Sequence, residues 1–144
     1  MKALVDTNVA LDVALLRPPH YEHSARVLEC ARLPGFHLFI TASSFTDLCY
    51  VLTRHCGVQA AKNFLNDLVG AVDVCPVDKP MILSALRSDF RDPEDAVQHF
   101  AAEAFGAEVI VTRNKADFAA STLEVLDPKE FCEKYLHANE SHCD

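Results

Sequence analysis

The sequence lacks the patterns that mark membrane and exported proteins. No run of about 18 or more apolar residues occurs among the 144 residues, so we expect no membrane-spanning helix. The apolar N-terminal stretch is interrupted by Asp6 and Asp12 and is not followed by a small-residue cleavage site, which argues against a signal peptide. These absences predict a cytoplasmic protein that makes no membrane contact.

Motifs of several common catalytic and metal-binding classes are also missing. There is no glycine-rich loop ending in Lys-Ser/Thr and no G-x-S-x-G segment, so neither P-loop hydrolysis nor an α/β-hydrolase nucleophile is expected. The six cysteines form no C-x-x-C pair, and most lie within apolar patterns, as Cys49 does. We interpret them as buried, reduced thiols rather than zinc ligands or disulfides.

Positive charge is scarce. Thirteen Lys and Arg residues face 21 Asp and Glu residues, which gives a formal net charge of −8. A chain of this charge does not bind polyanions through its overall field. If it acts on nucleic acid, a metal ion must neutralise some of its carboxylates and a local basic rim must guide the strand.

The length and the hydrophobic half of the composition are enough for one domain with a substantial core. We predict a single domain over residues 1–136 and a disordered tail over 137–144. Short apolar runs alternate with amphipathic segments, which predicts a parallel sheet covered by helices on both faces. The expected strands are 2–5, 37–40, 73–77, 109–111 and 123–126. The expected helices are 7–16, 21–32, 45–54, 58–69, 79–87, 93–105 and 128–136.

Polar side chains follow the predicted strands at the edge where such sheets place their sites. Asp6 follows the first strand, and Asp47 lies one turn into the helix after the second. Asp95 is in the first turn of the helix that precedes the fourth strand, and Asp117 follows that strand. We therefore expect four carboxylates from distant parts of the chain to meet. The other polar residues at this edge are Asn8, Ser43, Ser44, Thr112 and Asn114.

Grouped carboxylates repel one another unless a cation holds them together. Hard oxygen ligands, without His or Cys at zinc-like spacing, suit Mg²⁺ or Mn²⁺. Such an ion polarises a phosphoryl group and activates water for in-line attack. With the other hydrolase motifs absent, metal-assisted phosphodiester hydrolysis is the chemistry that these residues favour.

Several segments also resemble a known family. Leu4-Val5-Asp6-Thr7-Asn8-Val9 is similar to the opening motif of PIN domains. Asp92-Pro93-Glu94-Asp95-Ala96-Val97-Gln98 and Val111-Thr112-Arg113-Asn114-Lys115-Ala116-Asp117-Phe118 resemble the D-x-E-D-A-x-Q and T-R-N-x-x-D-F motifs of one PIN subgroup. The closing Val125–Phe131 segment fits the subgroup's usual end. These segments occur in the family's order and span nearly the whole chain.

The resemblance implies a three-layer α/β/α PIN-like domain with a mainly parallel sheet of four to five strands. It also implies a metal-dependent endoribonuclease, often the toxin of a VapC-like toxin–antitoxin pair, with RNA as substrate and an antitoxin as partner. Asp6, Asp95 and Asp117 match family acids. Asp47 stands where the family commonly has Glu, so its shorter side chain leaves contact with the metal to a bridging water.

The remaining polar residues near these motifs receive secondary roles. We expect Asn8, Ser43, Glu94, Thr112 and Asn114 to support the acids. Two cations lie close to the proposed site in the sequence, and we expect them to steer the RNA backbone: Arg113 and Lys115.

Simpler interpretations exist for each acid alone. Asp6 can cap a helix, and Asp117 can be an ordinary turn residue. Asp95 can simply be an acid that interacts favourably with the positive end of a helix dipole. Their joint order along the chain favours a common site. A binding module without turnover, a housekeeping RNA-processing nuclease and a DNA phosphoesterase stay open as alternatives. The apolar helices around 10–16 and 45–52 also suggest a homodimer.

Overall fold

The computed structural model describes residues 1–136, so the predicted tail at 137–144 lies outside the described residues. The strands are β1 (Lys2–Val5), β2 (His37–Thr41), β3 (Asp73–Cys75), β4 (Val109–Val111) and β5 (Glu124–Leu126). The α-helices are α1 (Thr7–Ala14), α2 (Tyr21–Glu29), α3 (Ala42–Ala71), α4 (Lys79–Leu86), α5 (Pro93–Ala104) and α6 (Pro128–Phe131). Short 3₁₀ or π turns are η1 (Cys30–Arg32), η2 (Lys115–Phe118) and η3 (Cys132–Leu136). The predicted order of strands and helices is confirmed.

Within residues 1–136, five strands form one sheet in the order β3-β2-β1-β4-β5, and every neighbouring pair is parallel. From β1 the chain proceeds to β2 and β3 on one side, and then crosses to β4 on the other side of β1. The strand order therefore reverses between β1 and β4. Val5 pairs with Val111 there, so the residues that follow both strands emerge together at the sheet's switch point.

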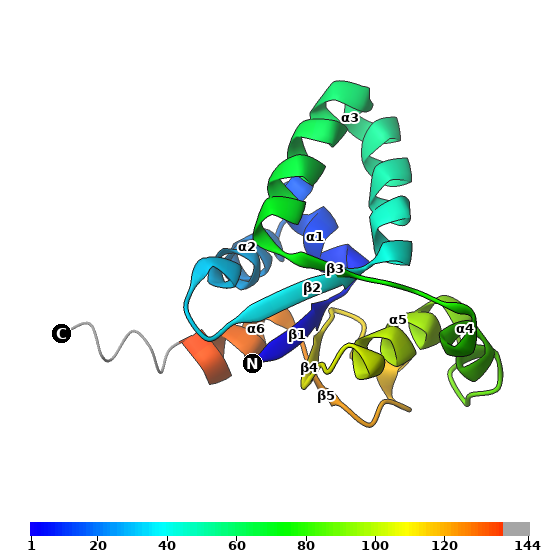
Figure 1. Cartoon of the computed structure of the whole chain (residues 1–144). Coiled ribbons are helices and arrows are strands. Elements are labelled where there is room, and N and C mark those ends of the chain that lie inside the picture. The colour runs from blue at the N-terminus through cyan, green and yellow to red at the C-terminus, as the bar shows by residue number, and fades with distance from the viewer. Residues whose placement is uncertain (137–144) are drawn as a thin grey trace.

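Helices cover both faces of the sheet, as the α/β/α prediction requires (Figure 1). Alternate residues of β1 point to opposite faces. Ala3 and Val5 join a core with residues of α1, α2, α3 and α6. Leu4 joins a second core, which includes Ala101 of α5 and Phe118 of η2. Because both faces are buried, the strands consist of continuous apolar runs rather than alternating ones.

The long helix α3 consists of two helical arms joined at a sharp bend. In Figure 1 the two arms rise from the sheet and meet at the top. Gly57 makes the bend, with φ 84° and ψ 166°, a conformation that is accessible mainly to glycine. The predicted break between two helices at Gly57 is therefore confirmed. β3 is shorter than predicted and ends at Cys75, because Pro76 has no N–H to donate to a neighbouring strand.

Cys30, Cys49, Cys56 and Cys75 are free thiols, as predicted. The predicted burial holds for Cys30 and Cys75, whereas Cys49 is half-buried and Cys56 is exposed on α3. Burial raises the pKa of Cys30 to about 12 and that of Cys75 to about 11, so both thiols stay protonated and unreactive at neutral pH. No helix in the described part of the chain is both long and apolar enough to cross a membrane.

Candidate functional site

Asp6 is the most firmly held acid at the switch point. It lies directly after β1 and is only 4 % exposed. As the N-cap of α1, its Oδ1 accepts a hydrogen bond from the backbone N–H of Thr7 at 2.7 Å. Its Oδ2 accepts from the Thr112 hydroxyl at 2.7 Å, and its Oδ1 also accepts from the Gln98 amide at 3.1 Å. These donors fix the carboxylate, so the helix-cap interpretation and the site interpretation both apply to Asp6.

Beside Asp6 lies a cavity of about 350 Å³, which we call the acidic cavity. Residues of α1, α3, α5 and the segment after β4 line this cavity, and the four predicted acids are among them. Its lining residues are Asp6, Thr7, Asn8, Leu11, Asp47, Tyr50, Val51, Asp92, Glu94, Asp95, Gln98, Asn114 and Asp117.

The acids of this cavity raise one another's pKa values. The pKa of Asp95 is raised to about 7 by burial and by the charges of Asp6, Asp92 and Asp117. The pKa of Glu94 is also raised to about 7, first by a side-chain hydrogen bond with Asp47. The charges of Asp92 and Asp95 raise the pKa of Glu94 as well, so the acids form one mutually repelling set. A cation in the cavity would relieve these repulsions.

The donor set suits a divalent ion that keeps much of its water. Among residues 1–136, no three His, Cys, Asp or Glu side chains already stand as a group that could hold a metal ion. Mg²⁺ does not require such a cage, because it is typically bound through one or two carboxylates and retains several waters. The oxygen-only chemistry of Asp6, Asp95 and Asp117 therefore fits Mg²⁺ or Mn²⁺ and does not fit a closed zinc site.

The residues predicted to support the acids lie in three different places. Asn8, Asn114 and Glu94 line the acidic cavity as expected. Thr112 is fully buried and contacts Asp6 from behind, while its oxygen also accepts from the Asn114 backbone N–H at 3.0 Å. Ser43 does not line the cavity, and its hydroxyl pairs with that of Thr41 at 2.9 Å.

Two residues that the sequence analysis named near the site, but to which it gave no role, complete this network. Ser44 is 2.6 Å from the Thr7 hydroxyl and donates to the Gln98 carbonyl oxygen at 3.3 Å. Gln98 in turn donates to Asp6, so its amide is oriented by Ser44 and orients Asp6. The helical spacing of Asp95 and Gln98, three residues apart on one face of α5, was the available signal for Gln98.

The two expected cations are both engaged elsewhere. Arg113 Nε lies 2.8 Å from Oδ2 of Asp12, which is completely buried. Lys115 pairs with Glu130 at 2.8 Å. The Lys115 pair is exposed and is easily exchanged for a phosphate, whereas Arg113 has a structural partner. Neither residue lines the acidic cavity.

The repulsion among these acids predicts that Asp95→Asn stabilises the metal-free protein. Because the pKa of Asp95 is about 7 in the folded state and its ordinary value is 3.8, stability falls as the pH rises between these values. At pH 8 the variant should gain about 1 kcal/mol, or roughly 2–4 °C in melting temperature. At pH 4 the gain should largely vanish. Thermal melts in EDTA at both pH values test this, and a variant less stable than the wild type at pH 8 would contradict it.

Fold and cavity together define a parallel α/β protein with an acidic site at the switch point of its sheet. The sequence profile of the PIN domain family matches residues 2–116. The chain therefore belongs to the PIN domain family, as its motifs suggested.

Individual relatives agree with this assignment. The chain is 26 % identical over 139 residues to ribonuclease VapC1 of Aquifex aeolicus (strain VF5), which covers 93 % of this chain and 95 % of the relative. The fold of the present chain resembles that of a chain in the structure of VapBC2 from Rickettsia felis bound to a promoter DNA fragment, with a TM-score of 0.70. The two chains are 15 % identical, and the match covers 88 % of this chain and 98 % of the other. A toxin–antitoxin complex from Klebsiella pneumoniae gives a TM-score of 0.66 and 22 % identity over 88 % and 97 %.

Proposed function

We propose that this protein is a Mg²⁺- or Mn²⁺-dependent endoribonuclease and the toxin of a toxin–antitoxin pair. The observation that carries the proposal is the meeting of Asp6, Asp47, Asp95 and Asp117 from four separate segments at one cavity. Family membership and the similarity to a protein named as a ribonuclease support RNA as the substrate. The likeness to a toxin–antitoxin complex supports the toxin role.

In this proposal Asp6, Asp95 and Asp117 hold the divalent ion, and Asp47 acts from the edge of the cavity. When bound, the ion supplies a Lewis acid that stabilises charge on the phosphate and activates water for attack. The protein's own contribution is positional. Thr112 and Gln98 keep the Asp6 carboxylate fixed before the substrate arrives, which reduces the reorganisation needed during the reaction.

The side-chain amides of Asn8 and Asn114 are suited to binding the substrate phosphate. They line the cavity without adding negative charge and carry N–H donors that suit phosphate oxygens. A substrate phosphate among several carboxylates needs such neutral donors, because like charges would otherwise repel it. We assign Asn8 and Asn114 to substrate orientation and Thr112 to the positioning of Asp6.

The partners follow from the same proposal. An antitoxin protein is the expected regulator, and a homodimer and a cytoplasmic location stay predictions. The free thiols within residues 1–136 fit a reducing compartment. A monomeric mass in solution at micromolar concentration would contradict the dimer.

The test is cleavage of a pool of structured RNAs by the purified protein with Mg²⁺, with Mn²⁺ and with EDTA. We expect internal cuts with either metal and none with EDTA. A DNA pool of matched sequence separates a ribonuclease from a general phosphoesterase. Cleavage that persists in EDTA would contradict the metal dependence, and RNA binding without any turnover would favour the binding-module alternative.

A further inference from the structure

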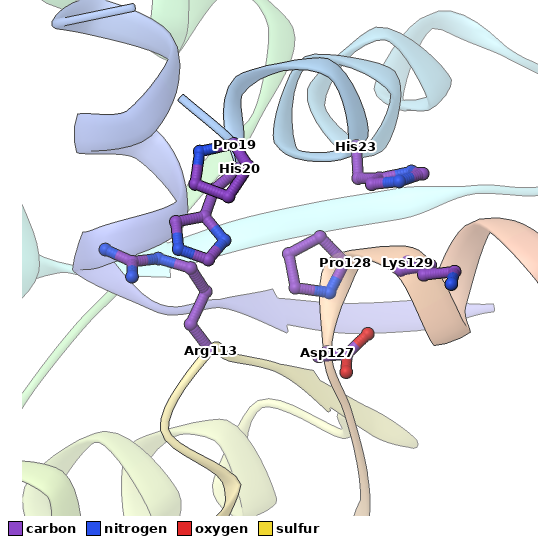
Figure 2. Close-up of a pocket in the computed structure, with 7 residues that line it drawn as sticks. All are labelled: Pro19, His20, His23, Arg113, Asp127, Pro128 and Lys129. Atoms are coloured by element: carbon purple, nitrogen blue, oxygen red, sulfur yellow. The ribbon is translucent and has the colours of Figure 1, made fainter. Parts of the chain in front are cut away.

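A second cavity of about 340 Å³ opens beside the segment that follows β4 (Figure 2). Its walls come from the loop before α2, from α2, from the segment after β4 and from the start of α6. Its polar character is mainly basic, and we call it the basic cavity. The side chains that line it are Pro19, His20, His23, Arg113, Asp127, Pro128 and Lys129.

Four side chains of this cavity carry nitrogen donors: His20, His23, Arg113 and Lys129. In Figure 2 the His20 ring lies beside the Arg113 guanidinium, and Lys129 extends from the start of α6. Nδ1 of His23 is buried, and none of the residues that the structure describes forms a hydrogen bond with it. An unpaired buried polar atom is costly, so a ligand atom that formed a hydrogen bond with this nitrogen would be favoured.

The charged side chains around the basic cavity differ in how firmly their present partners hold them. Arg113 is anchored from behind by buried Asp12. Asp127 uses its carboxylate to cap α6 and accepts from the Glu130 N–H at 2.8 Å. Lys129 has only a 4.0 Å contact with Glu133, and both side chains are well exposed, so this ammonium is readily redirected. An anion entering the cavity thus meets oriented donors and one acid that is occupied elsewhere.

A metal ion is a poorer occupant than an anion. The cavity holds two histidines and one aspartate, and that aspartate already caps α6. Arginine and lysine in the same wall repel cations. Guanidinium, ammonium and imidazole groups are instead the common protein donors to phosphate oxygens.

The two cavities flank one short stretch of backbone. Thr112 contacts Asp6, Arg113 lines the basic cavity, and Asn114 lines the acidic cavity. Consecutive Cα atoms are about 3.8 Å apart, so the two cavities are lined by side chains from directly neighbouring positions. This arrangement also answers the charge problem, because a protein of net charge −8 needs a local basic surface to retain a polyanion.

We propose that the basic cavity binds a backbone phosphate of the RNA strand next to the phosphate held at the acidic cavity. The proposal rests on the ribonuclease function proposed above and adds a substrate-positioning site to it. Lys129 and His20 contact the phosphate, and Arg113, fixed by Asp12, supplies the central donor.

The experiment measures RNA binding without cleavage, in EDTA, by anisotropy of a labelled single-stranded RNA at several KCl concentrations. We expect His20→Gln combined with Lys129→Gln to weaken binding by about tenfold at low salt and to reduce the salt slope by about one. Lys62→Gln, at an exposed site on α3, is the matched control and should bind like the wild type. Unchanged affinity and slope in the double variant would overturn the proposal.

A second readout does not depend on RNA. Titration with inorganic phosphate should shift the NMR signals of His20 and His23 in the wild type and much less in Lys129→Gln. No shift in the wild type would also overturn the proposal. The two proposals can fail separately. If the wild type binds phosphate but cleaves no RNA, only the proposed nuclease function is contradicted. If the wild type cleaves RNA but the double variant binds RNA as tightly as the wild type, only the proposed phosphate site is contradicted.

Discussion

Asp6→Asn is expected to reduce metal-dependent RNA cleavage by roughly 10³-fold, equivalent to about 4 kcal/mol of transition-state stabilisation. The substitution removes the charge of the best-positioned acid in the cavity. It preserves the local structure, because the Asn Oδ1 still accepts from Thr7 and Gln98, and its amide can donate to the Thr112 oxygen. The variant should therefore fold normally and fail chemically.

The measurement is the initial cleavage rate on the RNA pool, with a thermal melt of the same sample. Asp73→Asn is the control, because Asp73 is an exposed acid at the start of β3, at the opposite end of the strands from the cavity. We expect it to cut at the wild-type rate. If Asp6→Asn retains activity within tenfold of the wild type, Asp6 is a helix cap and not part of the catalytic site.

Arg113→Ala is expected to have the largest effect on stability, a loss of about 3 kcal/mol. Asp12 is completely buried, and its charged partner is Arg113, with Nε 2.8 Å from Oδ2. Ser24 also donates to this oxygen at 3.1 Å, but no residue within 1–136 forms a hydrogen bond with Oδ1. Removing the guanidinium therefore leaves a buried carboxylate without its counter-charge.

Urea unfolding of a double-mutant cycle tests this explanation. Asp12→Asn combined with Arg113→Ala should be more stable than Arg113→Ala alone, because the uncompensated charge is then gone. An Arg113→Ala variant within 1 kcal/mol of the wild type would contradict the structural role. The result also governs how Arg113 variants are interpreted, since weaker RNA binding by an unstable protein does not identify an RNA contact.

Much of the fold could be predicted because local sequence and tertiary structure agree. The runs at 2–5 and 109–111 are short, apolar and followed by polar residues, and both are buried parallel strands. Pro93 with Glu94 and Asp95 marks the start of α5. The meeting of the acids followed from one general property, that parallel strands bring their carboxyl ends to one edge.

The sequence is least informative where side-chain direction or distant packing decides. Ser43 and Ser44 are neighbours, but one residue rotates a helix by about 100°, so only Ser44 reaches Gln98. The ion pair between Arg113 and Asp12 was not predicted, because the sequence does not indicate that Asp12, about a hundred positions earlier, is buried beside Arg113. The basic cavity was missed for the same reason, since its walls come from three separate parts of the chain.

The most direct test of the central claim is Mn²⁺ binding to metal-free protein, followed by the electron paramagnetic resonance signal of the free ion. It requires no knowledge of the RNA target. We predict saturable binding by the wild type and by Asp73→Asn, and binding at least about tenfold weaker for Asp6→Asn and Asp95→Asn. Equal binding by all four proteins would contradict the metal site at the acidic cavity and, with it, the proposed chemistry.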